Sequence, residues 1–89
     1  MLFNNNYPKH KSLDIFKINQ INNKGESALS IAVSNNNIEV VKILIEMGAD
    51  INNANNNNES PYSIAIVNNY KECIELFNLV LANSNNYQN

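Results

Sequence analysis

The chain has 89 residues, six lysines, eight acidic residues and a net charge of −2, which leaves room for one domain with a small core. It has no arginine and no basic stripe, so the composition argues against nucleic acid and anionic membrane surfaces as partners. A single cysteine excludes an internal disulfide framework, and no apolar run has the length of a membrane span.

Residues 1–21 are predicted to be an irregular segment that partly caps the domain. Pro8 is incompatible with the interior of a helix, whereas residues 12–16 could form one short turn that covers the apolar face behind them. The first six residues lack the charged start and apolar stretch of a signal peptide. We therefore expect an intracellular protein, either cytoplasmic or nuclear.

Residues 22–54 are predicted to form two short helices. The first begins after Ser27, whose side-chain oxygen can cap the first turn. Asn35–Asn37 end it, because asparagine adopts the left-handed conformation more readily than other side chains do. The second helix runs from Ile38 to Met47, and Gly48 ends it.

Residues 55–83 repeat this pattern with a period of 33 residues. Eight of the 19 residues from Glu26 to Leu44 are identical to their counterparts from Glu59 to Phe77, and most of the others are apolar in both copies. Pro61 directly follows Ser60, which is the favoured order at a helix start. The chain is therefore predicted to contain two successive copies of one helical unit.

The second copy ends differently from the first. It lacks the Gly-Ala-Asp-Ile-Asn exit, and its last helix is predicted to continue through Leu81. Residues 84–89 form a polar tail, and we expect the chain to be disordered from Asn83 onward.

Three strings resemble an ankyrin repeat: GESALSIA at 25–32, EVVKILI at 39–45 and GADIN at 48–52. The resemblance implies an all-α solenoid of about two and a half helix-turn-helix repeats joined by hairpin loops. Residues 22–54 would then be an ankyrin repeat and residues 55–83 a C-terminal capping repeat. Isolated arrays usually need about three repeats. Either the short N-terminal cap suffices, or the chain needs a partner or a second copy of itself.

Some residues depart from the family pattern. Ser30 and Ser63 stand where the family has a histidine that links neighbouring repeats, so we expect that hydrogen-bond network to be weaker. Asn36, Asn58 and Asn69 stand in place of glycines, and asparagine is the side chain that best tolerates the same backbone conformation.

Little in the sequence supports catalysis or metal binding, so we expect a protein that is not an enzyme and has no cofactor. Cys73 aligns with Val40 and is interpreted as a small buried hydrophobe. His10 lies in a polar segment and is interpreted as a solvated side chain. A structural zinc site needs about four ligands of this class, and the sequence supplies two.

The resemblance implies that the chain holds an unknown protein partner on its hairpin tips and on the faces of its first helices. The alternative is that these side chains are only solvated. Tryptophan and arginine, which often dominate interfaces, are absent, so we expect binding weaker than micromolar. The predicted hairpin residues are Asn23, Lys24, Glu26, Asn56, Asn57 and Glu59, and the predicted helix-face residues are Ser34, Asn35, Val67 and Asn68.

Two other roles remain open. Leu44, Asp50, Ile51 and Asn52 match the pattern around hairpin asparagines that are hydroxylated in many ankyrin proteins, which would make the chain the substrate of an oxygenase. Asn52 would otherwise be a structural hairpin residue. Alternatively, the whole chain is a spacer or cap in a larger assembly. It would then be a monomer or associate weakly through its end, at residues 79–81 (LVL).

Overall fold

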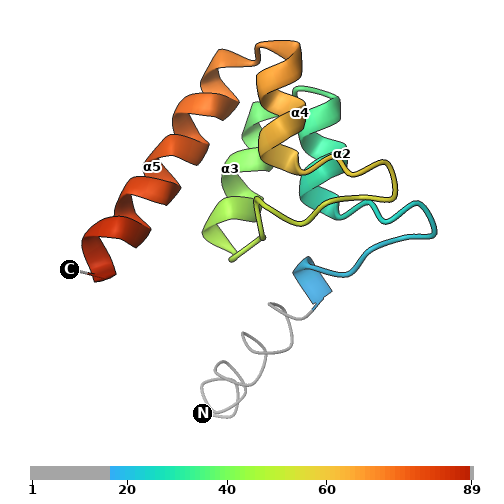
Figure 1. The fold of residues 1–89 in the computed structure, drawn as a ribbon, viewed down its shortest axis with the longest axis horizontal. Helices are drawn as coiled ribbons and strands as arrows, with labels where there is room; N and C mark the ends of the chain where they lie inside the picture. The colour runs from blue at the N-terminus through green and yellow to red at the C-terminus, as the bar shows by residue number, and fades with distance from the viewer. Residues whose placement is uncertain (1–16, 89) are drawn as a thin grey trace, which may run out of the picture.

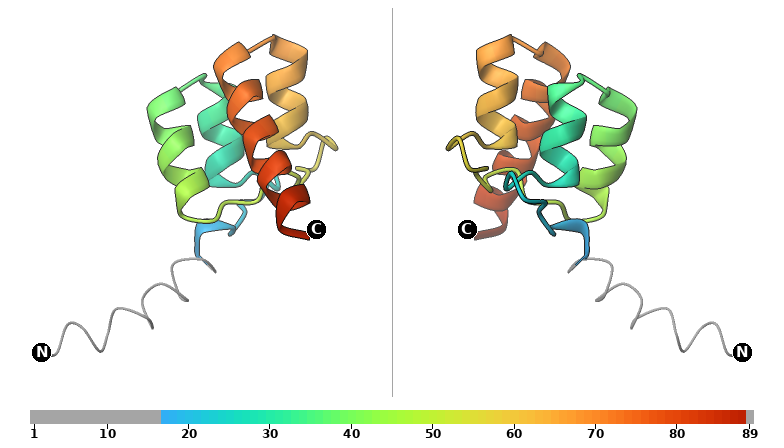
Figure 2. Two further views of the ribbon diagram at one scale, coloured as in Figure 1. Left: turned by 90° about the vertical axis from the view of Figure 1, so that its left-hand side faces the viewer. Right: turned by 90° about the vertical axis from the view of Figure 1, so that its right-hand side faces the viewer.

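The computed structural model describes residues 17–88, with side chains described through residue 83. Four helices follow one another in this part of the chain: α2 (Ala28–Ser34), α3 (Ile38–Glu46), α4 (Pro61–Asn68) and α5 (Lys71–Gln88). They form two antiparallel pairs, which stack so that α2 lies beside α4 and α3 beside α5 (Figure 1, Figure 2). The predicted all-α repeat fold is confirmed. The predictions for Pro8, His10 and residues 12–16 lie outside the described residues.

Both first helices begin with a reciprocal serine pair, of which the sequence predicted the cap at Ser27. Ser27 Oγ accepts a hydrogen bond from the Ser30 backbone N–H at 3.1 Å, and Ser30 Oγ accepts one from the Ser27 N–H at 3.0 Å. Ser60 and Ser63 make the same pair at 3.1 and 2.8 Å, and Pro61 is the first residue of α4. The hydroxyls of Ser30 and Ser63 each donate back to their own cap residue. Their hydrogen bonds therefore stay within one repeat, as expected of side chains shorter than histidine.

The bends that follow the helices use left-handed backbone conformations. Asn36 has φ 52° after α2, and Asn69 has φ 58° after α4. Gly48, which follows α3, has φ 93°, and Asn58 in the second hairpin has φ 65°. The left-handed backbone conformation predicted for Asn36, Asn58 and Asn69 is thus confirmed. Asparagine adopts this conformation at a smaller steric cost than other side chains do.

The predicted end of the last helix is wrong. Disorder was expected from Asn83 onward, but α5 continues to Gln88. In the first repeat Gly48 stops α3, whereas Leu81 occupies the equivalent position of α5. No glycine or proline follows it, so nothing interrupts the backbone hydrogen bonds of the helix. Within the described residues, no helix is both long and apolar enough to cross a membrane.

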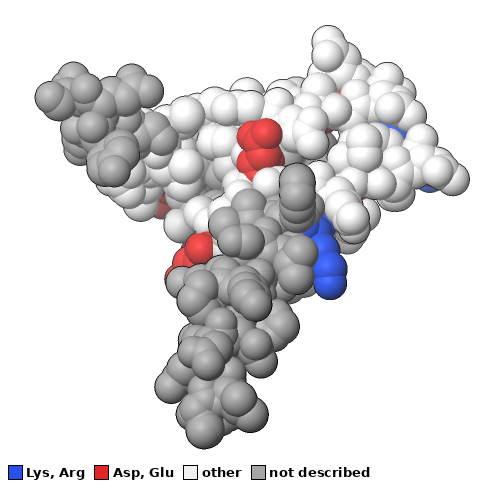
Figure 3. All heavy atoms as spheres, turned by 90° about the horizontal axis from the view of Figure 1, so that it is seen from below, with Lys and Arg blue, Asp and Glu red and all other residues white. Residues whose placement is uncertain are grey.

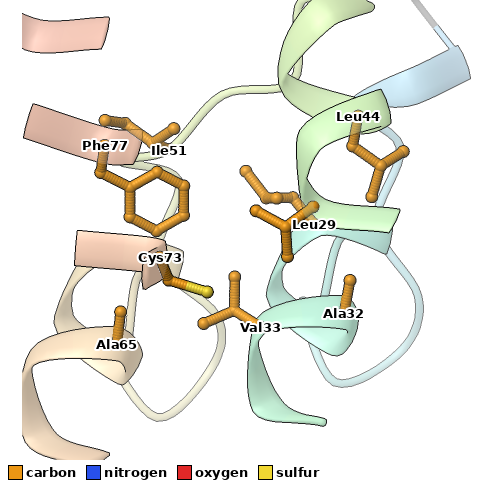
Figure 4. Close-up of a cluster of buried hydrophobic side chains, with 9 residues drawn as sticks. Leu29, Ala32, Val33, Leu44, Ile51, Ala65, Cys73 and Phe77 are labelled. Carbon is orange, nitrogen blue, oxygen red and sulfur yellow. The ribbon is translucent and has the colours of Figure 1, made fainter. Parts of the chain in front are cut away.

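The core lies between the two helix pairs and is shared by both. Phe77 and Cys73 of α5 point toward Leu29 and Val33 of α2, and all four side chains are fully buried (Figure 4). The ring of Phe77 also meets Tyr62 edge to face, with ring centroids 5.9 Å apart. Each repeat thus buries its apolar side chains against the next one, as expected for a stacked array.

Equivalent positions of the two repeats differ in exposure according to whether a neighbouring repeat covers them. Val33 is fully buried because the second helix pair packs on it, whereas its counterpart Ile66 is 50% exposed. The relation reverses on the other side of the stack, where Val40 is 38% exposed and its counterpart Cys73 is fully buried. The C-terminal end of the stack therefore presents apolar surface.

Candidate functional site

One asparagine side chain holds each hairpin loop in shape. Asn22 Oδ1 accepts from the backbone N–H groups of Lys24 and Glu26, at 2.9 and 3.0 Å, and its Nδ2 donates to Glu26 Oε1 at 3.0 Å. Asn55 makes the same three bonds in the second hairpin, at 2.9, 2.9 and 3.0 Å, and holds Glu59. Both loops thus present a glutamate with one carboxylate oxygen anchored.

The two hairpins are joined by another asparagine. The backbone N–H of Asn56 donates to the Lys24 carbonyl at 3.0 Å, and its Nδ2 donates to the Asn23 carbonyl at 2.9 Å. The contact is close at Gly25 (φ +77°), where an added Cβ would lie 2.9 Å from the Asn56 nitrogen. The hairpins therefore project side by side from the helices as one tied unit (Figure 1).

A hollow of about 200 Å³ lies along α4, between Glu59 at the end of the second hairpin and Ser34 at the end of α2. Its apolar lining comes from Ile64, Val67 and Tyr70, and Val67 is 82% exposed. The polar lining comes from Ser34, Glu59, Ser63 and Asn68. An apolar surface edged by polar groups is the usual form of a recognition site.

The hollow brings together part of the predicted binding set. Ser34, Glu59, Val67 and Asn68 all line it. Asn35 is exposed at the end of α2, next to the lining residue Ser34. The remaining predicted residues, Asn23, Lys24, Glu26, Asn56 and Asn57, lie in the hairpin loops. Whether any of these residues contacts a partner stays a prediction.

Three lining residues were missed from the sequence: Ser63, Ile64 and Tyr70. Ile64 lies three residues before Val67, so helical spacing alone could have placed both on one face of α4. Tyr70 follows the helix, and its hydroxyl donates to the Ser34 carbonyl at a long distance of 3.5 Å. The position of Tyr70 in the lining depends on the stacking of α4 beside α2. A pattern of neighbouring residues in the sequence does not predict this stacking.

The chemistry of Cys73 is that of a structural residue. The side chain is fully buried, and burial, followed by the nearby carboxylate of Glu72, raises the pKa of its thiol. A neutral buried thiol is a poor nucleophile. No group of three or more His, Cys, Asp or Glu side chains in the described residues could hold a metal ion.

Asn52 is exposed in the turn after α3. Its backbone N–H donates to Asp50 Oδ1 at 2.9 Å, while its side-chain amide has no partner among the described residues. The equivalent Asn19 uses Oδ1 to accept from the Asp50 backbone N–H at 2.8 Å. The Asn52 amide is therefore accessible. Its hydroxylation stays a prediction, which the intact mass of native protein tests, because one added oxygen atom is required.

One face of the described part of the chain carries few charged side chains. Seen from below, most of it is neither acidic nor basic, and lysines form no continuous stripe (Figure 3). Glu59 is the one charged residue that lines the hollow within the described part of the chain.

Two comparisons with known proteins bear on the chain. A family model described as ankyrin repeats, in three copies, matches residues 2–88. A comparison with curated proteins finds no match. The matched range includes residues 2–16, which lie outside the described part of the structure.

Proposed function

The chain belongs to the ankyrin repeat family, and we propose that it is a protein-interaction module that holds its partner in the hollow beside the second hairpin. Ankyrin repeats generally bind protein partners and are typically not enzymes. The observation that carries the proposal for this site is the hollow, in whose lining the apolar side chain of Val67 is 82% exposed.

The size of the hollow favours a protein side chain over a small molecule. Its volume of about 200 Å³ is below the ~300–1,000 Å³ usual for sites that enclose small ligands and cofactors. One or two side chains of a partner would fill it, while the hairpin loops offer further contacts at Lys24 and Asn57. Without tryptophan or arginine on this surface, we expect the affinity to be weaker than micromolar.

A pull-down from source-cell lysate with two matched variants tests this function. Val67→Asp places a charge in the hollow, and Leu79→Asp places the same charge on α5, outside the lining. Both side chains are mainly exposed, at 82% and 61%, so both variants should fold, which circular dichroism checks. We expect the Val67 variant to lose proteins that the wild type and the Leu79 variant both retain.

The structural alternative is favoured by a different observation, the apolar end of the stack. Ile66 is 50% exposed at a position where the first repeat buries Val33, and Leu79 is exposed on the last helix. A spacer or cap would bury these side chains against another molecule. Loss of self-association or of bound proteins in the Leu79 variant, with the Val67 variant unaffected, would favour this role over binding in the hollow.

A further inference from the structure

Most hydrogen-bond donors that line the hollow are already engaged within the chain. Ser63 Oγ donates to the Ser60 carbonyl at 2.9 Å, and Asn68 Nδ2 donates to the Ile64 carbonyl at 2.9 Å. The Tyr70 hydroxyl is directed to the Ser34 carbonyl. Among the described residues, the side-chain donors of the lining without a partner are the Ser34 hydroxyl and the second hydrogen of Asn68 Nδ2.

The acceptors of the hollow are less occupied. Glu59 Oε1 accepts from Asn55, but Oε2 has no partner among the described residues. Asn68 Oδ1 is likewise without a partner there, because the amide is held through its nitrogen. Of the described residues that line the hollow, Glu59 is the one that carries a charge, and the chain as a whole carries a net charge of −2. Both hydrogen bonding and charge therefore favour a donor that is also a cation.

We propose that the hollow takes a segment of a protein partner in which a Lys or Arg side chain lies beside an aliphatic one. The cation pairs with Glu59, whose orientation Asn55 fixes at 3.0 Å. The aliphatic side chain packs on Val67 and Ile64, which are three residues apart on one face of α4. This inference rests on the proposed function, since it names the chemistry of the partner at the same site.

Selection from a random twelve-residue peptide library displayed on phage tests the proposal on the full chain. Three variants are selected in parallel with the wild type. Glu59→Gln keeps an oxygen that can accept from Asn55 but removes the charge, and Val67→Asp removes the apolar contact. Glu75→Gln neutralises an exposed carboxylate of α5 outside the lining and serves as the matched control.

We expect the wild type and the Glu75 control to enrich peptides with Lys or Arg beside an aliphatic residue. The Glu59 variant should lose the cation enrichment while keeping the aliphatic one. The Val67 variant should lose the aliphatic enrichment while keeping the cation enrichment, because its Asp adds a second carboxylate to the hollow. Cationic peptides selected equally by the Glu59 variant would overturn the proposal, as would wild-type peptides without cations or no enrichment at all. Identical selections by wild type and Val67→Asp would contradict the proposed function as well.

The affinity of one selected peptide provides a second readout. Fluorescence anisotropy should give about fivefold weaker binding for Glu59→Gln at low salt, the upper end expected of an exposed ion pair. The difference should shrink as ionic strength rises, because salt screens the pair. A Glu59 effect that does not change with salt would contradict an ion pair with the partner.

Discussion

Asparagine takes two different structural roles in this chain at the scale of single residues. Asn36, Asn58 and Asn69 occupy positive-φ positions, where other side chains lose stability. Asn22 and Asn55 instead use their side chains to close the hairpin loops through three hydrogen bonds each. A quarter of the chain is asparagine. Because these two roles differ, the structural role of an asparagine has to be assigned position by position.

Asn55→Ala and Asn57→Ala separate a structural asparagine from a solvated one. The first removes three hydrogen bonds from the second hairpin and should lower the free energy of unfolding by about 1–2 kcal/mol. The Asn57 side chain makes no hydrogen bond with the described residues, so its removal should change stability by less than about 0.5 kcal/mol. Urea unfolding measures both, and equal effects would refute this assignment.

The buried thiol of Cys73 should make stability depend on alkaline pH. Burial and Glu72 raise the thiol pKa in the folded chain above the ordinary value of 9.0, so the folded state binds this proton more tightly than the unfolded state. Stability is then intact below pH 9.0 and falls as pH rises from there toward the folded pKa. Urea unfolding across this range should show a steeper loss for wild type than for Cys73→Ala, which has no thiol to titrate.

The contact between hairpins distinguishes the two repeats at the scale of elements. Gly25 faces the next hairpin, and a Cβ there would lie 2.6 Å from Asn56 Oδ1 and 2.9 Å from its backbone nitrogen. The equivalent residue of the second hairpin is Asn58, which keeps a similar positive φ and carries a side chain. A further hairpin could therefore not approach Asn58 as closely as the second hairpin approaches Gly25, unless the backbone shifted.

Exchanging these two residues tests the close approach. Gly25→Asn keeps a residue that tolerates positive φ, so its cost should come mainly from overpacking, about 1–3 kcal/mol. Asn58→Gly removes a side chain from the outer hairpin and should change stability by less than about 0.5 kcal/mol. Thermal or urea unfolding of both variants gives the comparison. A Gly25 variant as stable as wild type would mean that the hairpins separate easily.

Helix length is also decided at this scale, by the residue at the end of the apolar pattern. Gly48 ends α3 in a left-handed turn, but the equivalent Leu81 lies inside α5, which runs to Gln88. The apolar pattern predicted the helix as far as Leu81, because those residues repeat with helical spacing. The polar composition after Leu81 does not indicate a helix, but this segment also lacks a helix-breaking residue, so the helix continues.

At the scale of the whole molecule, the two repeats depend on one core. Phe77 and Cys73 of the second repeat meet Leu29 and Val33 of the first, and all are fully buried (Figure 4). A domain of this size has a total stability of only about 5–15 kcal/mol. Neither repeat can therefore lose this contact and retain a complete core.

Phe77→Leu should weaken both repeats together. It introduces the residue found at the equivalent position 44, and the smaller side chain should cost about 1–2 kcal/mol by leaving space in the core. Hydrogen exchange should show faster exchange of backbone amides in both α2 and α4. Leu79→Ala on the same helix, where the side chain is 61% exposed, is the control and should have little effect. Faster exchange confined to α4 and α5 would show that the repeats unfold separately.

The positions of the helix starts and of most bends could be predicted because they depend on neighbours along the chain. Ser27 and Ser60 cap helices through residues three positions away, and Asn36 and Asn69 turn the backbone by their own conformational preference. The 33-residue period then predicted the repeat fold, because each copy is too small to bury its own apolar face.

Only the tertiary structure decided which predicted site residues lie together. Ser34, Glu59 and Val67 come from three different elements and line one hollow only because the second helix pair stacks on the first. The same stacking brings in Tyr70, ties Asn56 to the first hairpin, and leaves Ile66 exposed where Val33 is buried. These features depend on distances between segments far apart in sequence, whereas the caps and bends depend on residues within one turn of each other.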